Sequence, residues 1–127
     1  MTSNHTLLII AHGSRKASSN DEVIAVVSKV KERLKENYFS VDAVFLELAT
    51  PSIEDGIKSS VAKGATTIVF LPYFLSVGRH VSSDIPEIIK NQQELYPDIT
   101  FRVLHHLGSE EGILSLLSDM ALEGALI

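Results

Sequence analysis

The sequence predicts an α/β fold: one domain over residues 1–127, in which a four-stranded parallel sheet has helices on both faces. Short apolar runs alternate along the chain with longer segments whose apolar residues recur at helical spacing. The first apolar run is continuous, which is typical of a strand buried on both sides. No linker, repeat or low-complexity segment divides the 127 residues, a length that suits one domain.

The first strand is expected at Thr6–Ala11, where the continuous apolar run lies. A helix is expected to follow at Asn20–Asn37, because Ser19 and Glu22 have the spacing of a capping box at its start. The residues that would form its buried stripe are spaced for one helical face: Val23, Val26, Val27, Val30 and Leu34.

The second strand is expected at Val41–Leu48. After it, Thr50 should cap a helix whose first residue is Pro51. Proline suits this position because the N–H that it lacks would make no hydrogen bond within the first turn. That helix should end near Lys63, with Gly64 in the left-handed position that often follows a helix.

The third strand is expected at Thr66–Pro72, where β-branched residues are frequent. The next helix should begin at Asp84, which has capping-box spacing with Glu87 and would leave Pro86 in the tolerant first turn. Its buried stripe would comprise Ile85, Ile88, Ile89 and Leu95.

The fourth strand is expected at Ile99–His105, and the last helix after a cap at Ser109. Its core face would comprise Ile113, Leu116, Leu117 and Met120. Strand–helix units in series, with right-handed crossovers, predict the strand order 2-1-3-4. Ligands of such sheets bind outside the carboxyl ends of the strands, at the crevice between strands 1 and 3 where the winding reverses.

The composition excludes several kinds of protein. The chain has no cysteine, which excludes disulfides, thiolate metal sites and thiol nucleophiles. A net charge of −5 and the absence of Trp argue against nucleic-acid binding. No apolar run is long enough to span a membrane, and no signal-peptide pattern follows Met1. We therefore expect a cytoplasmic protein that binds neither nucleic acid nor membrane.

Two histidines are expected at the crevice, one from each of the strands that flank it. His12 follows the first strand, and His80 ends the segment Pro72–His80 that follows the third. An imidazole there can bind a divalent metal ion such as Co²⁺, Ni²⁺ or Fe²⁺, or accept a proton near neutral pH. A single loop histidine is usually only solvated, so the pair is what indicates a site.

Charged side chains surround these histidines. Glu47 is expected near the carboxyl end of an apolar strand, where a buried carboxylate needs a partner. It would ligate the metal or orient a histidine, or else pair with Arg15 or Arg79 at the rim. Arg15, Lys16 and Arg79 would form a positive rim for an anionic substrate, because guanidinium groups bind carboxylates in pairs. The alternative is scattered surface charge.

Three further histidines are not expected to form the site. His105 and His106 end the fourth strand, away from the centre of the crevice, and successive side chains of a strand point to opposite faces. His5 lies in the N-terminal stretch, where a solvated side chain is the simpler interpretation.

Motifs of a known family stand at these same positions. They are Ala11–Arg15 (AHGSR), Phe45–Ala49 (FLELA) with Pro51–Ile53, Pro72–Leu75 (PYFL), and Gly78–Val81 (GRHV) with Asp84–Pro86. Together they resemble the class II chelatases, specifically the short form of the sirohydrochlorin cobaltochelatases, the CbiX family. The resemblance covers almost the whole chain.

The resemblance implies a chelatase that inserts Co²⁺, as substrate metal, into sirohydrochlorin without an organic cofactor. His12 and His80 would bind the metal and, with Glu47, form the catalytic group. Arg15, Arg79 and Ser14 would bind the substrate. Chains of this length correspond to one half of longer, two-lobed chelatases, so the resemblance also implies a homodimer with the macrocycle near the interface.

Other interpretations stay open. The same ligands suit Fe²⁺ insertion for sirohaem, or Ni²⁺. A non-catalytic carrier would bind the metal or the tetrapyrrole without turnover. A histidine phosphatase also places His-Gly after its first strand, but that chemistry usually needs an arginine directly before the histidine, where this chain has Ala11.

Overall fold

The computed structural model describes residues 4–124, and of His80 it describes the backbone alone. Strands and helices alternate along the chain, as the sequence predicts. Their bounds are β1 His5–Ala11, α1 Ala17–Arg33, β2 Ser40–Phe45, α2 Ile53–Ala62, β3 Thr67–Pro72, α3 Arg79–Leu95, β4 Thr100–Val103, the 3₁₀ turn η1 Leu107–Ser109 and α4 Glu111–Glu123.

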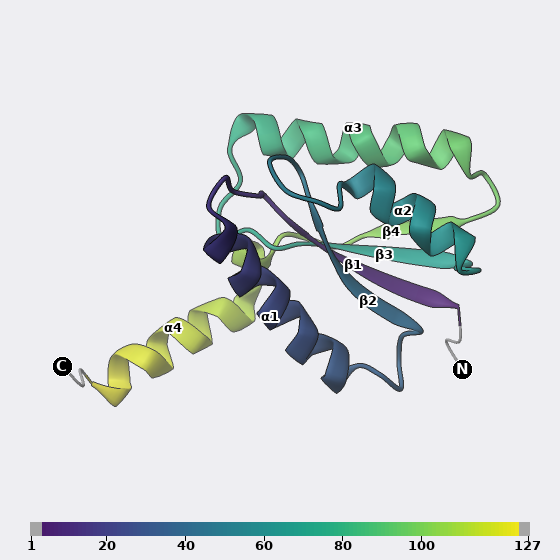
Figure 1. Cartoon of the computed structure of the whole chain (residues 1–127). Helices are drawn as coiled ribbons and strands as arrows, with labels where there is room; N and C mark the ends of the chain where they lie inside the picture. The colour runs from purple at the N-terminus through teal and green to yellow at the C-terminus, as the bar shows by residue number, and fades with distance from the viewer. Residues whose placement is uncertain (1–3, 125–127) are drawn as a thin grey trace.

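The strands form one parallel sheet in the predicted order β2-β1-β3-β4. β1 is central: Ala11 lies opposite Phe45 of β2, and Ile10 lies opposite Pro72 of β3. The carboxyl ends of these three strands therefore meet at one edge of the sheet (Figure 1). This edge is where the sequence predicts the site.

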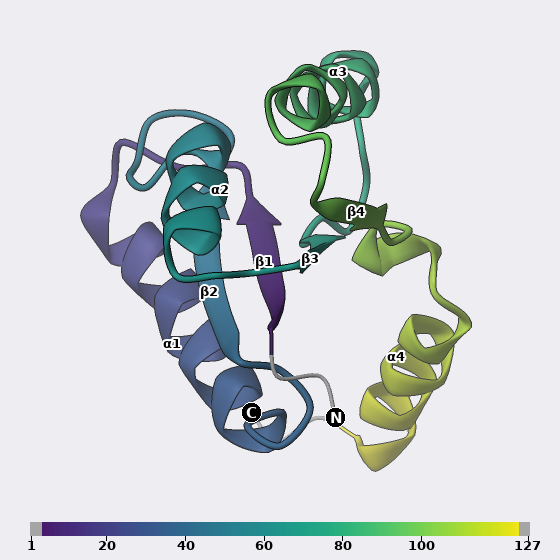
Figure 2. The same ribbon diagram turned by 90° about the vertical axis from the view of Figure 1, so that its right-hand side faces the viewer.

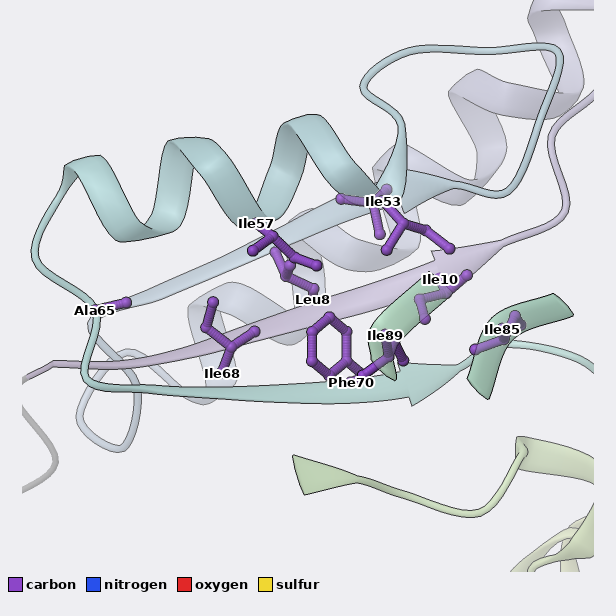
Figure 3. Packing of buried hydrophobic residues seen from close by; sticks show 10 residues of the cluster. Leu8, Ile10, Ile53, Ile57, Ala65, Ile68, Phe70, Ile85 and Ile89 are labelled. Carbon is purple, nitrogen blue, oxygen red and sulfur yellow. The ribbon is translucent and has the colours of Figure 1, made fainter. Parts of the chain in front are cut away.

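The core forms a layer on each face of the sheet. α2 and α3 cover one face, over a cluster of buried side chains that includes Val44. Figure 3 labels most of the others: Leu8, Ile10, Ile53, Ile57, Ile68, Phe70, Ile85 and Ile89. α1 covers the other face, over Leu7, Ile9, Val27, Val41 and Val69. Successive β1 residues thus enter opposite layers, which is why the first apolar run is continuous.

Helix starts are the commonest difference from prediction. α2 begins at Ile53 after Ser52, whose hydroxyl accepts from the Asp55 N–H at 3.1 Å, so the predicted cap at Thr50 is wrong. The reason is that Pro51 belongs to the end of the sheet: its carbonyl accepts a hydrogen bond from the Phe45 N–H at 2.9 Å. Gly64, by contrast, takes the predicted positive φ of 93°.

α3 begins at Arg79, not at Asp84, so the predicted capping box of Asp84 and Glu87 is wrong. The Ser82 N–H donates to the Gly78 carbonyl at 3.0 Å and closes the first turn there. Pro86 consequently lies inside the helix, where it removes one backbone hydrogen bond. The two carboxylates are left on the helix surface.

The other two helices also begin without the predicted caps. α1 starts at Ala17 after Lys16, which makes no side-chain cap, so the capping box of Ser19 and Glu22 is wrong. Ser109 ends η1 and donates its hydroxyl to the His106 carbonyl at 2.7 Å, leaving α4 to start at Glu111 without a side-chain cap. Within residues 4–124, no helix is both long and apolar enough to cross a membrane.

Parts of the predicted buried stripes are exposed. Ile85 and Ile89 of α3 are buried as predicted, whereas Leu95, the last residue of the helix, is 65% exposed. The larger difference concerns α4, whose predicted core residues Leu116 and Met120 are both exposed. α4 runs away from the sheet instead of packing on it (Figure 1).

The core supports a stability prediction at Ile57, which is fully buried between α2 and the sheet. Ile57→Val should lower the free energy of unfolding by about 1 kcal/mol, since one buried methyl group is lost and the space is only partly refilled. Urea unfolding measures it. Ile24→Val, at an exposed position of α1, is the matched control and should change stability by less than about 0.5 kcal/mol.

Candidate functional site

The loops that follow β1 and β2 continue the sheet beyond its strands. The Leu46 N–H donates to the Ala11 carbonyl at 2.9 Å, and the Glu47 N–H donates to the His12 carbonyl at 3.0 Å. These bonds hold the main chains of His12 and Glu47 side by side at the carboxyl edge. The position of both side chains is therefore set by the backbone pairing.

His12 and Glu47 also meet through their side chains. His12 Nε2 lies 3.4 Å from Glu47 Oε2, with the two side chains 50% and 55% exposed. His12 Nδ1 lies 3.2 Å from the Gly13 carbonyl oxygen. In the tautomer that donates from Nδ1 to this carbonyl, Nε2 keeps its lone pair for a metal ion beside the carboxylate.

The structure corrects the predicted setting of Glu47. The residue lies just past β2 and not within it, and its side chain is half-exposed, so no burial penalty demands a partner. Among the described side chains, the basic group within 4 Å of its carboxylate is the His12 imidazole, not Arg15 or Arg79. Glu47 is thus free to share a ligand with the imidazole.

Gly13 is what allows the two loops to approach so closely. Its φ is +95°, in the left-handed region, and a Cβ on it would lie 1.7 Å from the Glu47 carbonyl oxygen. Only glycine fits both conditions. The glycine of the His-Gly motif therefore serves the contact between the loops.

Asn20 fixes the segment that leads from His12 into α1, and the sequence analysis missed it. Its side-chain amide accepts from the Ser14 N–H at 2.9 Å and donates to the Ser14 carbonyl at 2.8 Å. The Ser14 hydroxyl accepts from the Lys16 N–H at 3.0 Å. Ser14, a predicted substrate-binding residue, is thus partly engaged within its own loop and retains its hydroxyl proton for donation.

A cleft of about 660 Å³ adjoins the His12–Glu47 pair. Its residues come from the β1 and β2 loops and from one face of α3: His12, Leu46, Glu47, Val81, Asp84, Glu87, Ile88 and Asn91. The volume is within the usual range of small-ligand sites. The carboxylates of Glu47, Asp84 and Glu87 give the cleft a negative charge that attracts cations.

Asp84 and Glu87 were predicted as helix caps and not as site residues. The signal that could have found them is the spacing of Val81, Asp84, Ile88 and Asn91, which follows a single helical face. That face becomes recognisable only once the helix is known to begin at Arg79.

His80 is the second residue of α3, and Val81, which follows it, is among the residues that line the cleft together with His12. The backbone of His80 is therefore adjacent in sequence to a residue of the cleft that His12 lines. Sharing of one metal ion by His12 and His80 stays a prediction. Among the side chains that the structure describes, no group of three or more His, Asp or Glu residues could hold a metal ion.

The predicted basic rim is exposed but does not line the cleft. Arg15 and Lys16 lie in the loop before α1, and Arg79 begins α3. Their contact with substrate stays a prediction.

The remaining histidines lie outside the cleft. His105 is exposed and His106 half-buried, and both follow β4 instead of ending it, because the strand stops at Val103. His5 is not in a frayed terminus: it is the first residue of β1, and its carbonyl accepts from the Phe39 N–H at 2.8 Å.

Known proteins are similar to this chain in sequence and in fold. A sirohydrochlorin ferrochelatase of Priestia megaterium is 34% identical over 113 residues, which cover 89% of this chain and 42% of that protein. A sirohydrochlorin cobaltochelatase of Sulfolobus acidocaldarius is 30% identical over 115 residues, which cover 91% of this chain and 88% of that protein.

Among solved structures, the sirohydrochlorin chelatase SirB of Bacillus subtilis subspecies spizizenii, in complex with cobalt, matches with a TM-score of 0.80 and 28% identity. The match covers 94% of this chain and 50% of SirB. The chain thus spans about half the length of SirB and of the Priestia relative, and most of the Sulfolobus relative. The CbiX family matches residues 6–123. The chain therefore belongs to the CbiX family.

Proposed function

We propose that this protein is a sirohydrochlorin chelatase that inserts Co²⁺ into the macrocycle. The observation that carries the proposal is the His12–Glu47 pair, 3.4 Å apart in the lining of an acidic cleft. Membership of the CbiX family, with relatives named as sirohydrochlorin chelatases, supports the choice of substrate.

The metal would be held by His12 Nε2 and Glu47, with His80 as a second imidazole ligand from α3. Imidazole suits Co²⁺, Fe²⁺ and Ni²⁺, and a carboxylate adds charge attraction. Both described side chains are half-exposed, so water can complete the coordination and be displaced. Such an open site suits an ion that must be handed on.

Insertion releases two protons from the pyrrole nitrogens as the divalent ion takes their place, with no change of oxidation state. A base within hydrogen-bonding reach accelerates such a transfer. Glu47 and His12 would accept these protons and pass them to the adjoining solvent. The carboxylates of Asp84 and Glu87 lie along the same cleft.

Arg15, Arg79 and Ser14 would grip the carboxylates at the edge of the macrocycle. Binding energy gained there can support distortion of the ring, which opens a face of the pyrrole nitrogens to the metal. We propose that two chains pair to hold the macrocycle between them.

A second candidate is Fe²⁺ insertion. It is favoured by the similarity to the Priestia relative named a ferrochelatase, which at 34% identity is as near as the relatives named cobaltochelatases. A carrier that binds the ion or the macrocycle without turnover is the non-enzymatic alternative.

One assay separates these functions. Sirohydrochlorin is mixed with Co²⁺, Fe²⁺ or Ni²⁺ under anaerobic conditions, with and without the protein, and the change in the macrocycle absorption is followed. We expect Co²⁺ to be inserted well above the spontaneous rate and faster than Fe²⁺. Faster insertion of Fe²⁺ would reassign the metal. A rate equal to the spontaneous one for every ion would identify a carrier.

A further inference from the structure

Leu48 has a backbone conformation that leucine rarely adopts. Its φ is +64°, in the left-handed region, and among the described residues every other positive φ belongs to a glycine. In that region the Cβ of an ordinary residue crowds the neighbouring carbonyl oxygen, whereas glycine has no Cβ to crowd it. Residues held in such strained conformations cluster at functional sites.

The loop that contains Leu48 explains why the bend falls there. The Glu47 main chain is fixed, since its N–H donates to the His12 carbonyl at 3.0 Å. The chain must nevertheless return at once, because the Phe45 N–H donates to the Pro51 carbonyl at 2.9 Å. Figure 2 shows this loop beyond the end of the sheet, beside the loop that leaves β1. The loop thus requires a left-handed residue, but it does not require a leucine.

The side chain of Leu48 does not serve the core of its own chain. It is 52% exposed, and it belongs to neither of the two buried layers as the structure describes them. Leu46 packs against the core and lines the acidic cleft, whereas Leu48 lies outside that cleft. A single exposed leucine is ordinary. One that is held in a strained backbone directly after Glu47 is not explained by the fold, because glycine would suit the loop better.

Charge indicates where a macrocycle can lie relative to the His12–Glu47 pair. Among the described residues that line the cleft are the carboxylates of Glu47, Asp84 and Glu87, and none of these lining residues is a lysine or an arginine. A tetrapyrrole whose edge carries carboxylates would be repelled there, whereas a metal ion would be attracted. The ring is therefore expected outside the cleft, where Leu48 lies beside Glu47.

We propose that Leu48 contacts the apolar face of the macrocycle and holds the ring at the His12–Glu47 pair. A tetrapyrrole is flat and apolar across its faces and charged at its edge, so a leucine next to a metal ligand suits the face, whereas arginines suit the edge. The inference rests on the proposed chelatase function. It assigns to Leu48 the recognition of the ring and leaves the metal ion to His12 and Glu47.

Binding of metal-free sirohydrochlorin, followed by the change in its absorption, tests this role. Leu48→Gly and Leu48→Ala both remove the side chain, and each should raise the dissociation constant of the macrocycle about tenfold. Leu48→Met keeps an apolar side chain of similar size and should stay within about threefold of the unmodified chain. Leu95→Ala is the matched control and should change nothing, because Leu95 is an exposed leucine at the far end of α3 and outside the cleft.

Calorimetric titration with Co²⁺ alone separates recognition of the ring from support of the metal site. Leu48→Gly should bind the ion as tightly as the unmodified chain does. In the insertion assay, its KM for the macrocycle should therefore rise while its KM for Co²⁺ stays unchanged. Urea unfolding checks the strain: Leu48→Gly should resist urea better than Leu48→Ala, because only glycine relieves the left-handed backbone.

Four results would overturn the proposal. Unchanged binding of the macrocycle by Leu48→Gly and Leu48→Ala, in chains that still insert metal, would show that Leu48 does not meet the ring and would leave the chelatase function standing. Equal loss of macrocycle and Co²⁺ binding would mean that Leu48 only supports the loop of Glu47. Greater resistance of Leu48→Ala to urea would show that the backbone is not strained. An unmodified chain that binds no sirohydrochlorin would reject the chelatase and the role of Leu48 together.

Discussion

Replacing Gly13 by alanine is expected to abolish metal insertion and to lower the free energy of unfolding by several kcal/mol. The new Cβ would lie 1.7 Å from the Glu47 carbonyl oxygen, in a backbone with φ of +95°. The main chain of Glu47 cannot move away from this Cβ without breaking the hydrogen bond from the Glu47 N–H to the His12 carbonyl. The pair that should hold the metal would separate.

The matched control for this prediction is Gly64→Ala. Gly64 has nearly the same φ, +93°, but a Cβ on it would meet nothing within 4 Å. The Gly64→Ala variant should therefore lose only about 1–2 kcal/mol of its free energy of unfolding, which is the cost of a left-handed backbone for alanine. It should keep full insertion activity. Urea unfolding and the insertion assay measure both variants. Equal behaviour of the two would mean that the close approach of the loops has no role.

His12→Ala should reduce the rate of Co²⁺ insertion by a factor on the order of 100 or more, because the substitution removes a side chain that is both a metal ligand and a proton acceptor. The side chain is half-exposed and His12 does not belong to the buried core, so stability should change little. The matched control is His105→Ala, an exposed histidine outside the cleft, which should leave the rate unchanged.

The dependence of the rate on metal concentration shows which role of His12 dominates. If the imidazole mainly binds the ion, a large excess of Co²⁺ should restore much of the rate. If it mainly accepts a proton, the maximal rate stays low at any metal concentration. Insertion by His12→Ala at the full rate would show that the site is assigned to the wrong residues.

Much of the fold follows from local patterns in the sequence. The continuous run of β1 sends Leu7 and Ile9 to one layer and Leu8 and Ile10 to the other, so a strand with both faces buried was predictable. The strand order followed from the handedness of the crossovers. The location of the candidate site followed in turn, since the parallel register fixes which strand ends meet.

The start of α3 could not be predicted in the same way. Asp84 and Glu87 have the spacing of a capping box, and Pro86 beside them is a common residue of first turns. The bond that begins the helix earlier, from the Ser82 N–H to the Gly78 carbonyl, has no distinctive sequence pattern. The acidic face that this helix gives to the cleft was missed for that reason.

The position of α4 could not be predicted because periodicity identifies an apolar face but not the surface that covers it. Leu116, Leu117 and Met120 have the spacing of core residues, yet the tight contact of Gly108 with Leu75 turns the helix away. Only a contact between segments far apart in the chain decides its direction. For Glu47, similarly, the apolar run did not show that the strand would end at Phe45.

The two walls of the cleft come from different parts of the fold, and the packing of one of them on the sheet sets the width of the cleft. One wall belongs to the ends of β1 and β2, whereas the other is the face of α3, which is seated on the sheet through Ile85 and Ile89. Size changes at these two buried positions would shift the helix toward or away from His12 without touching any chelating group. The width that the cleft offers to a ligand is therefore governed from beneath the helix.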